Sequence, residues 1–363
     1  MFGIYVHVPF CIRKCRYCDF NSYPGLENYF ERYAAAVADE AKSYGQTIDR
    51  TVDTVYFGGG TPTLADPRTL AGILDGVAAH FDLARDAEIT IEANPETVDR
   101  AKLAELSGAG FNRISIGFQS LDQQVLEFLG RGHSAEDAVK AFSAARRAGF
   151  DSISVDLIFG IPEQSMASWA GTLIQSVALG PDHISTYSLT LEEGTALAGL
   201  VDAGTVQPPD EDAAADMFEF ALDLLPDEGY EHYEISNFAK PRKHCKHNLI
   251  YWDMGDYIGI GAGAHSKLAA ERWANVAGVR EYLEATDKIE TKRLLDDSEL
   301  LSENLFLGLR KIDGVELREL KEAFGEETVA ALAPSLTKLT EAGLLKIVGD
   351  RLSLTFRVRR LGK

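Results

Sequence analysis

The first two-thirds of the chain alternates short runs rich in β-branched residues with longer stretches of helical periodicity. Parallel strands need long crossover connections, usually helices, so this rhythm predicts a parallel sheet. Six strand–helix units fall short of a complete eight-fold barrel. We therefore predict an α/β fold with a partial (βα)6 TIM-like barrel. The expected strands are 3–8, 53–58, 88–93, 113–117, 152–158 and 183–189, and the expected helices are 27–44, 67–80, 99–108, 122–129, 134–148 and 166–179.

Polar and glycine-rich groups gather at the ends of the expected strands, which is where such a barrel carries its chemistry. The first strand runs into a cysteine loop, and the second runs into Gly58-Gly59-Gly60-Thr61-Pro62. The next three strands carry or precede Glu92, Gln119 and Asp156. The sequence thus predicts one functional rim.

The cysteine loop has the spacing C-x3-C-x2-C, formed by Cys11, Cys15 and Cys18. A cubane iron–sulfur cluster usually takes four thiolates, so three cysteines would leave one iron open to a substrate or cofactor. The alternative is a zinc site completed by a distant fourth ligand.

The amino-acid composition argues against several classes of function. The 363-residue chain has 36 basic and 56 acidic side chains, a formal net charge of −20. This charge argues against nucleic-acid binding. No apolar stretch is long enough for a membrane span, and the N-terminus begins directly with an expected strand rather than a signal peptide. Four cysteines make no disulfide framework, so we expect a cytoplasmic protein.

A second constellation lies at 244–252, where two histidines, a thiol and two aromatic residues occur within nine residues. Imidazole and thiolate are axial haem ligands, and aromatic rings suit a flat macrocycle. The alternative is a local packing cluster of aromatic residues with surface histidines. His247 and Cys245 are the candidates in this segment.

The last part of the chain turns helical, with expected helices at 298–309, 316–324 and 328–342. A hairpin is expected over 344–348 and 351–355, around Gly349-Asp350. Three helices and a hairpin predict a small winged-helix-like module. We therefore expect a barrel domain over 1–230, a connecting segment over 231–296 and the C-terminal module over 297–363.

The order of these motifs resembles the radical S-adenosylmethionine (radical SAM) superfamily, in particular the group similar to oxygen-independent coproporphyrinogen III oxidase. The resemblance spans nearly the whole chain. It implies that Cys11, Cys15 and Cys18 hold a [4Fe-4S] cluster whose fourth iron binds S-adenosylmethionine. The contacts to S-adenosylmethionine that it implies are Tyr5, Tyr17, Gly59, Gly60, Thr61, Glu92, Gln119, Arg131 and Asp156.

Within this group, His-Asn-x-x-Tyr-Trp at 247–252 is typical of HemW-type haem chaperones. The resemblance implies haem as cargo, with His247 as the best haem contact and Cys245 as the second. Two departures from the oxidase pattern favour the chaperone branch. Asp19-Phe20 stands where the oxidase continues to a fourth cysteine, and the first strand begins almost at Met1, where the oxidase has an extension.

The chaperone interpretation implies that the protein binds haem and transfers it to recipient haem proteins, respiratory ones among them. It also implies an electron donor, and an exposed cluster edge could favour a homodimer. Because the residues needed to generate a radical are present, an alternative stays open. It is an oxygen-independent coproporphyrinogen III oxidase-like enzyme that oxidatively decarboxylates porphyrinogen propionates. The sequence does not decide whether the protein is an enzyme.

Overall fold

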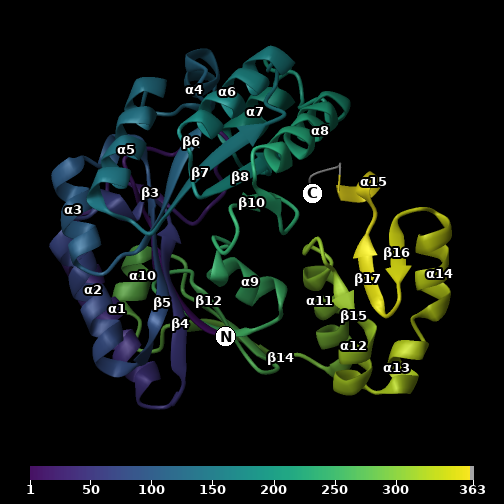
Figure 1. Cartoon of the computed structure of the whole chain (residues 1–363). Helices are drawn as coiled ribbons and strands as arrows, with labels where there is room; N and C mark the ends of the chain where they lie inside the picture. The colour runs from purple at the N-terminus through teal and green to yellow at the C-terminus, as the bar shows by residue number, and fades with distance from the viewer. Residues whose placement is uncertain (360–363) are drawn as a thin grey trace.

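The computed structural model describes residues 1–359, and its centre is one mixed sheet of twelve strands (Figure 1). The six predicted strands are confirmed: they lie side by side in chain order, and every neighbouring pair is parallel. They are β1 (Phe2–Val8), β4 (Thr51–Gly59), β5 (Asp82–Ala93), β6 (Arg113–Gln119), β7 (Ser152–Phe159) and β8 (His183–Ser188).

The six predicted crossover helices are confirmed within a few residues. The expected capping box opens α5, since the Ser134 side chain accepts from Asp137 N–H and the Asp137 side chain accepts from the Ser134 backbone. Gly149 ends this helix with φ of 88°, a left-handed conformation that favours glycine. The helices are α1 (Phe30–Gly45), α2 (Pro67–His80), α3 (Arg100–Gly108), α4 (Gln123–Leu129), α5 (Ala135–Ala148) and α6 (Met166–Ala178), followed by α7 (Ala196–Asp202) and α8 (Glu211–Asp227).

Residues 231–296, expected to connect two domains, extend the same sheet at both edges. One group of strands continues from β1, first parallel and then antiparallel, and a short antiparallel pair continues from β8. In the part of the chain that the structure describes, the outermost strands β14 and β9 are not paired, so the sheet is open. The added elements are β9 (Glu231–His232), β10 (Asn237–Ala239), α9 (Lys246–Trp252), β11 (Asp256–Ile260), β12 (His265–Leu268), β13 (Glu271–Asn275), α10 (Val279–Glu284) and β14 (Ile289–Leu294).

The C-terminal elements form a small group beside the rest of the molecule (Figure 1). The predicted hairpin is present as β16 and β17, and β15 completes a three-stranded sheet. The helix expected over 328–342 is divided, because Pro334 cannot donate a backbone hydrogen bond and lies in the first turn of a new helix. Residues 360–363 of the expected module lie outside the described residues. The elements are α11 (Asp297–Gly308), β15 (Val315–Glu316), α12 (Leu317–Phe324), α13 (Glu326–Ala330), α14 (Ala333–Glu341), β16 (Leu345–Val348), β17 (Arg351–Leu354) and α15 (Phe356–Arg359).

Alternate residues of the parallel strands point to opposite faces of the sheet. One set is apolar and joins the main hydrophobic core, for example Val55, Ile91, Ile116 and Val155. The other set is largely polar, and it lines a cavity on the opposite face. One face of the sheet therefore packs in the hydrophobic core, and the other face lines the cavity.

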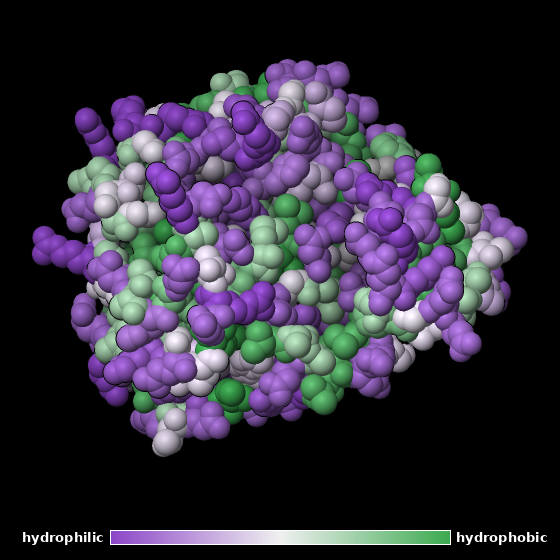
Figure 2. Space-filling view, turned by 60° about the horizontal axis from the view of Figure 1, so that its bottom comes forward, coloured by the Kyte–Doolittle hydropathy of each residue, from purple (hydrophilic) through white to green (hydrophobic). Residues whose placement is uncertain are grey.

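The molecular surface carries mostly hydrophilic residues with scattered hydrophobic patches on the face shown in Figure 2. Across residues 1–359, no helix is both long enough and apolar enough to cross a membrane.

Candidate functional site

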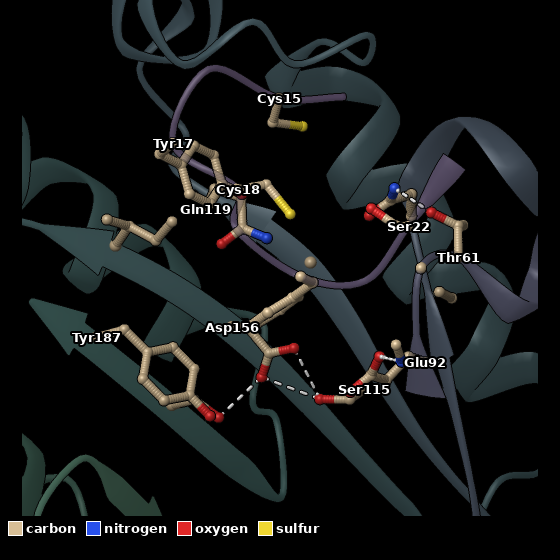
Figure 3. A pocket seen from close by; sticks show the side chains of 18 of the residues that line it. Cys15, Tyr17, Cys18, Ser22, Thr61, Glu92, Ser115, Gln119, Asp156 and Tyr187 are labelled. Carbon is tan, nitrogen blue, oxygen red and sulfur yellow. Dashed lines mark hydrogen bonds between the residues drawn. The ribbon is translucent and has the colours of Figure 1, made fainter. Parts of the chain in front are cut away.

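The candidate site is a cavity of about 440 Å³ on the polar face of the parallel strands. Figure 3 shows Cys15 and Cys18 on one side of it and Glu92 and Asp156 on the other. The cavity brings together most of the residues predicted for the site. Those that line it are Cys11, Cys15, Tyr17, Cys18, Gly59, Gly60, Thr61, Glu92, Gln119, Arg131, Asp156 and Cys245.

The three clustered cysteines line the cavity on the segment that follows β1, and each is partly exposed. Cys11 ends the two-residue strand β2 (Phe10–Cys11), and Cys15 and Cys18 lie in the loop after it. Cys11 Sγ lies 3.5 Å from Thr61 Oγ1, and Arg131 Nη1 donates to Cys15 Sγ at 3.5 Å. Burial raises the pKa of the Cys11 and Cys18 thiols. A positively charged group bound between the sulfurs would oppose this shift.

Two carboxylates form the opposite wall. Glu92 accepts from Tyr56 OH at 2.8 Å and from Gly59 N–H at 3.1 Å. Burial raises the pKa of Glu92 to about 7. The Ser115 hydroxyl donates to Asp156 at 2.8 Å (Figure 3). The Ser185 hydroxyl also donates to Asp156 at 2.8 Å, and burial raises the pKa of Asp156.

The glycine loop after β4 approaches the protein's own N-terminal strand. Gly59 has φ of +110°, and a side chain there would overlap the His7 ring. Gly60 N–H donates to Val8 O at 2.9 Å and Thr61 N–H donates to Phe10 O at 2.7 Å. The loop therefore anchors the start of the cysteine loop while it lines the cavity.

Arg131 and Gln119 lie beside the glycine Gly117. Arg131 donates to Gly117 O at 3.1 Å, and Gln119 has φ of +61°, an uncommon conformation outside glycine. A β-bulge near Gln119 interrupts the pairing of β6 with β7 and turns this side chain into the cavity.

The two predicted tyrosines are placed differently. Tyr17 lines the cavity, whereas Tyr5 lies behind it, with its ring stacked 6.2 Å from that of Tyr56. The Tyr5 hydroxyl bonds His7 Nδ1 at 3.0 Å. Tyr5 therefore supports the cavity wall through Tyr56 in this conformation.

The segment 244–252 contains the whole of helix α9, and Cys245 is the residue that precedes the helix. Cys245 is 3% exposed and lines the floor of the cavity, where burial raises its pKa to about 12. His247 is 1% exposed, and its Nδ1 and Nε2 are hydrogen bonded to Thr54 Oγ1 at 2.7 Å and Tyr251 OH at 2.8 Å. Burial lowers the pKa of His247 to about 3, so the ring is neutral. An iron bond to His247 requires that one of these hydrogen bonds be released.

Several cavity residues escaped the sequence analysis, and most of them are serines, threonines and aromatic residues, which are common in any strand. The signal was present in the alternation of Ser152-Ile153-Ser154-Val155-Asp156-Leu157, which places every second residue on the polar face. The missed residues include Tyr56, Thr90, Asn94, Arg113, Ser115, Ser154, His183, Ser185 and Tyr187.

The residues present fit a bulky polar ligand with an attached metal cluster. Three thiols face one cavity, and the buried hydroxyl of Thr90, which lines it, has no hydrogen-bond partner among the described residues. Within residues 1–359, no three His, Cys, Asp or Glu side chains are arranged to hold a single metal ion.

Comparison with known proteins shows the family and the fold of this chain. The model of the radical SAM superfamily matches residues 5–173, and that of the HemN C-terminal domain matches residues 295–360. The solved structure of coproporphyrinogen III oxidase (HemN) from Escherichia coli superposes with a TM-score of 0.86 at 22% identity, over 99% of this chain and 88% of that one. This similarity establishes the radical SAM α/β fold.

Curated relatives are more similar in sequence. Heme chaperone HemW from Mycobacterium tuberculosis is 40% identical over 99% of this chain and 92% of its own length. Heme chaperone HemW from Bacillus subtilis is 35% identical over 100% of this chain and 97% of its own length. The chain therefore belongs to the HemW heme chaperone family of the radical SAM superfamily.

Proposed function

We propose that this protein is a haem chaperone that binds haem and transfers it to recipient haem proteins. The observation that carries this proposal is the 40% identity to heme chaperone HemW of Mycobacterium tuberculosis across 99% of the chain. Respiratory haem proteins are the recipients that we propose to test first. Cytoplasmic location and a homodimer are parts of the same proposal.

The cavity supports a resident cluster and S-adenosylmethionine. Cys11, Cys15 and Cys18 would hold a [4Fe-4S] cluster in this cavity. Glu92 and Asp156 would accept from the ammonium or ribose hydroxyls of S-adenosylmethionine, and Arg131 would face its carboxylate. When both are bound, the cluster can supply one electron to the sulfonium, and an external electron donor must replace it.

His247 and Cys245 remain our proposed haem contacts. Cys245 already lies at the cavity floor. His247 lies one layer deeper, so we propose that haem binding moves α9 and frees one of the imidazole nitrogens from Thr54 or Tyr251. His247→Ala should weaken haem binding at least tenfold while the iron–sulfur cluster is retained.

A haem titration followed by absorbance tests this assignment. His244→Ala is the matched control, because His244 lies in the same segment but is more exposed and bonds Glu231 at 3.0 Å. An unchanged titration for His247→Ala would place the haem contact elsewhere.

A second function is an oxidative decarboxylase of porphyrinogen propionates. Its support is that the predicted radical site is assembled in one cavity and that the fold matches coproporphyrinogen III oxidase (HemN). Anaerobic protein with a reconstituted cluster, S-adenosylmethionine, reductant and coproporphyrinogen separates the two functions. Turnover to protoporphyrinogen without stable haem binding would overturn the chaperone proposal.

A further inference from the structure

We propose that Asn94 is a positioning residue that aims hydrogen-bond donors at two of the three cluster sulfurs and thereby raises the reduction potential of the cluster. The inference rests on the proposed cluster. Asn94 follows the last residue of β5 and precedes the short helix η3 (Pro95–Thr97), yet its side chain makes no capping hydrogen bond. Its amide is turned toward the cavity instead.

The amide of Asn94 joins two residues from distant parts of the chain. Its Nδ2 donates to Thr61 Oγ1 at 2.9 Å, and its Oδ1 accepts from Arg131 Nη2 at 2.5 Å. One side chain thus uses its donor and its acceptor on opposite partners, which fixes the orientation of the amide.

Each partner of Asn94 in turn reaches a cysteine. Thr61 Oγ1 lies 3.5 Å from Cys11 Sγ, and because this oxygen accepts from Asn94, its own hydrogen is available to the sulfur. Arg131 Nη1 donates to Cys15 Sγ at 3.5 Å. Asn94 therefore connects the donors of two thiolates without touching either.

The packing leaves these side chains few other positions. Thr61 is 2% exposed. Gly117 has no side chain, and a Cβ atom there would lie 3.1 Å from Asn94 Oδ1 and 3.3 Å from Arg131 Nη2. The absence of a side chain at Gly117 makes room for Asn94 and Arg131. Removal of the Asn94 side chain would leave a gap into which Arg131 and Thr61 can turn, away from the sulfurs.

The direction of the effect follows from charge. Reduction adds a negative charge to the cluster and its thiolates, and hydrogen bonds or a guanidinium at sulfur stabilise the reduced form. Asn94→Ala should therefore shift the midpoint potential to a more negative value. The cluster would become harder to reduce, although its three cysteines are unchanged.

A potentiometric titration of the reconstituted full-length protein, followed by electron paramagnetic resonance, tests this inference. Asn112→Ala is the matched control, because Asn112 also makes two hydrogen bonds at 2.8 Å, to Ile89 N–H and Ala87 O, and does not line the cavity. We expect a more negative midpoint for Asn94→Ala, a wild-type midpoint for Asn112→Ala, and a smaller effect of Asn94→Ala when Thr61 is already Val.

The experiment distinguishes a failure of the positioning role from a failure of the proposed function. A cluster in Asn94→Ala with the wild-type midpoint would overturn the positioning role and leave the proposed function intact, whereas wild-type protein that assembles no cluster would overturn the proposed function itself. If Asn94→Ala assembles no cluster, Thr61→Val decides. The inference then requires a more negative midpoint for Thr61→Val and recovery in Thr61→Ser, which keeps the hydroxyl.

Discussion

At the scale of single residues, the site depends on polar groups that are buried and hydrogen bonded at one rim. Glu92 shows the consequence, since its carboxyl is held by Tyr56 and by the backbone of the glycine loop while burial raises its pKa. Sites that must later bind a charged ligand often carry such shifts. Changes at Glu92 and at Cys15 test this arrangement.

Glu92 should make the stability of the ligand-free protein depend on pH. Burial raises its pKa from 4.5 to about 7, so the folded state binds the proton more tightly than the unfolded state does. Its contribution favours folding below pH 4.5 and is lost as pH rises toward 7, by about 3 kcal/mol at 1.36 kcal/mol per pKa unit. Glu92→Gln should remove this slope.

Urea unfolding of both proteins between pH 5 and pH 8 measures the slope. The difference in unfolding free energy between Glu92→Gln and the wild type should grow in favour of the variant as pH rises. A difference that is constant across this range would contradict the assignment of a raised pKa to Glu92.

Cys15 tests the cluster loop. Cys15→Ala should abolish the cluster absorbance after anaerobic reconstitution, because a cluster with only two protein thiolates is poorly held. The change should leave the fold intact, because Cys15 is only partly buried and lies outside the strands. Iron and sulfide analysis together with far-ultraviolet circular dichroism measures both, and a normal cluster would exclude Cys15 as a ligand.

At the scale of elements, the end of β4 shows why the glycine loop is needed. The strand ends at Gly59, where the chain turns with φ of +110° against the ring of His7 from β1. This close approach lets backbone hydrogen bonds tie the loop to the start of the cysteine segment. The glycine loop is therefore held in place by β1 where it lines the cavity.

Gly59→Ala should lower the free energy of unfolding by at least about 2 kcal/mol, from the left-handed backbone and the overlap with His7. Gly72→Ala is the matched control, because Gly72 lies within α2 with open space around it, and alanine there should stabilise by up to about 1 kcal/mol. Denaturant unfolding distinguishes the two. Equal effects would show that the position of Gly59 tolerates a side chain.

At the scale of the whole molecule, the N-terminal strand and strands from residues 231–296 meet in one sheet. β11 lies parallel beside β1, and β10 lies antiparallel beside β8. The cavity floor accordingly contains residues from the central strands and from the segment that follows them, such as Cys245. Ligand binding in this cavity should therefore stabilise the sheet as a unit.

We expect S-adenosylmethionine at about one hundred times its Kd to raise the unfolding free energy of cluster-loaded protein by about 2.7 kcal/mol. Asp156→Asn should reduce this gain. Ser115 and Ser185 hold the Asp156 carboxylate in place, and the neutral amide would bind the ammonium or ribose hydroxyls of S-adenosylmethionine less well. Thermal unfolding with and without the ligand, under anaerobic conditions, measures the gain. The absence of any shift in the wild-type protein would speak against the proposed cofactor.

The amino-acid sequence by itself determined the six strand–helix units, the cysteine loop and the order of polar groups at the strand ends, because these depend on local periodicity and on short spacings. The strands of residues 231–296 were missed, since they are short and pair with the edges of an existing sheet. Only the tertiary structure decided that Asn94 joins Thr61 to Arg131 and that His247 is fully hydrogen bonded. The contacts of Asn94 with Thr61 and Arg131, and of His247 with Thr54, join residues far apart in the chain, and no local pattern encodes them.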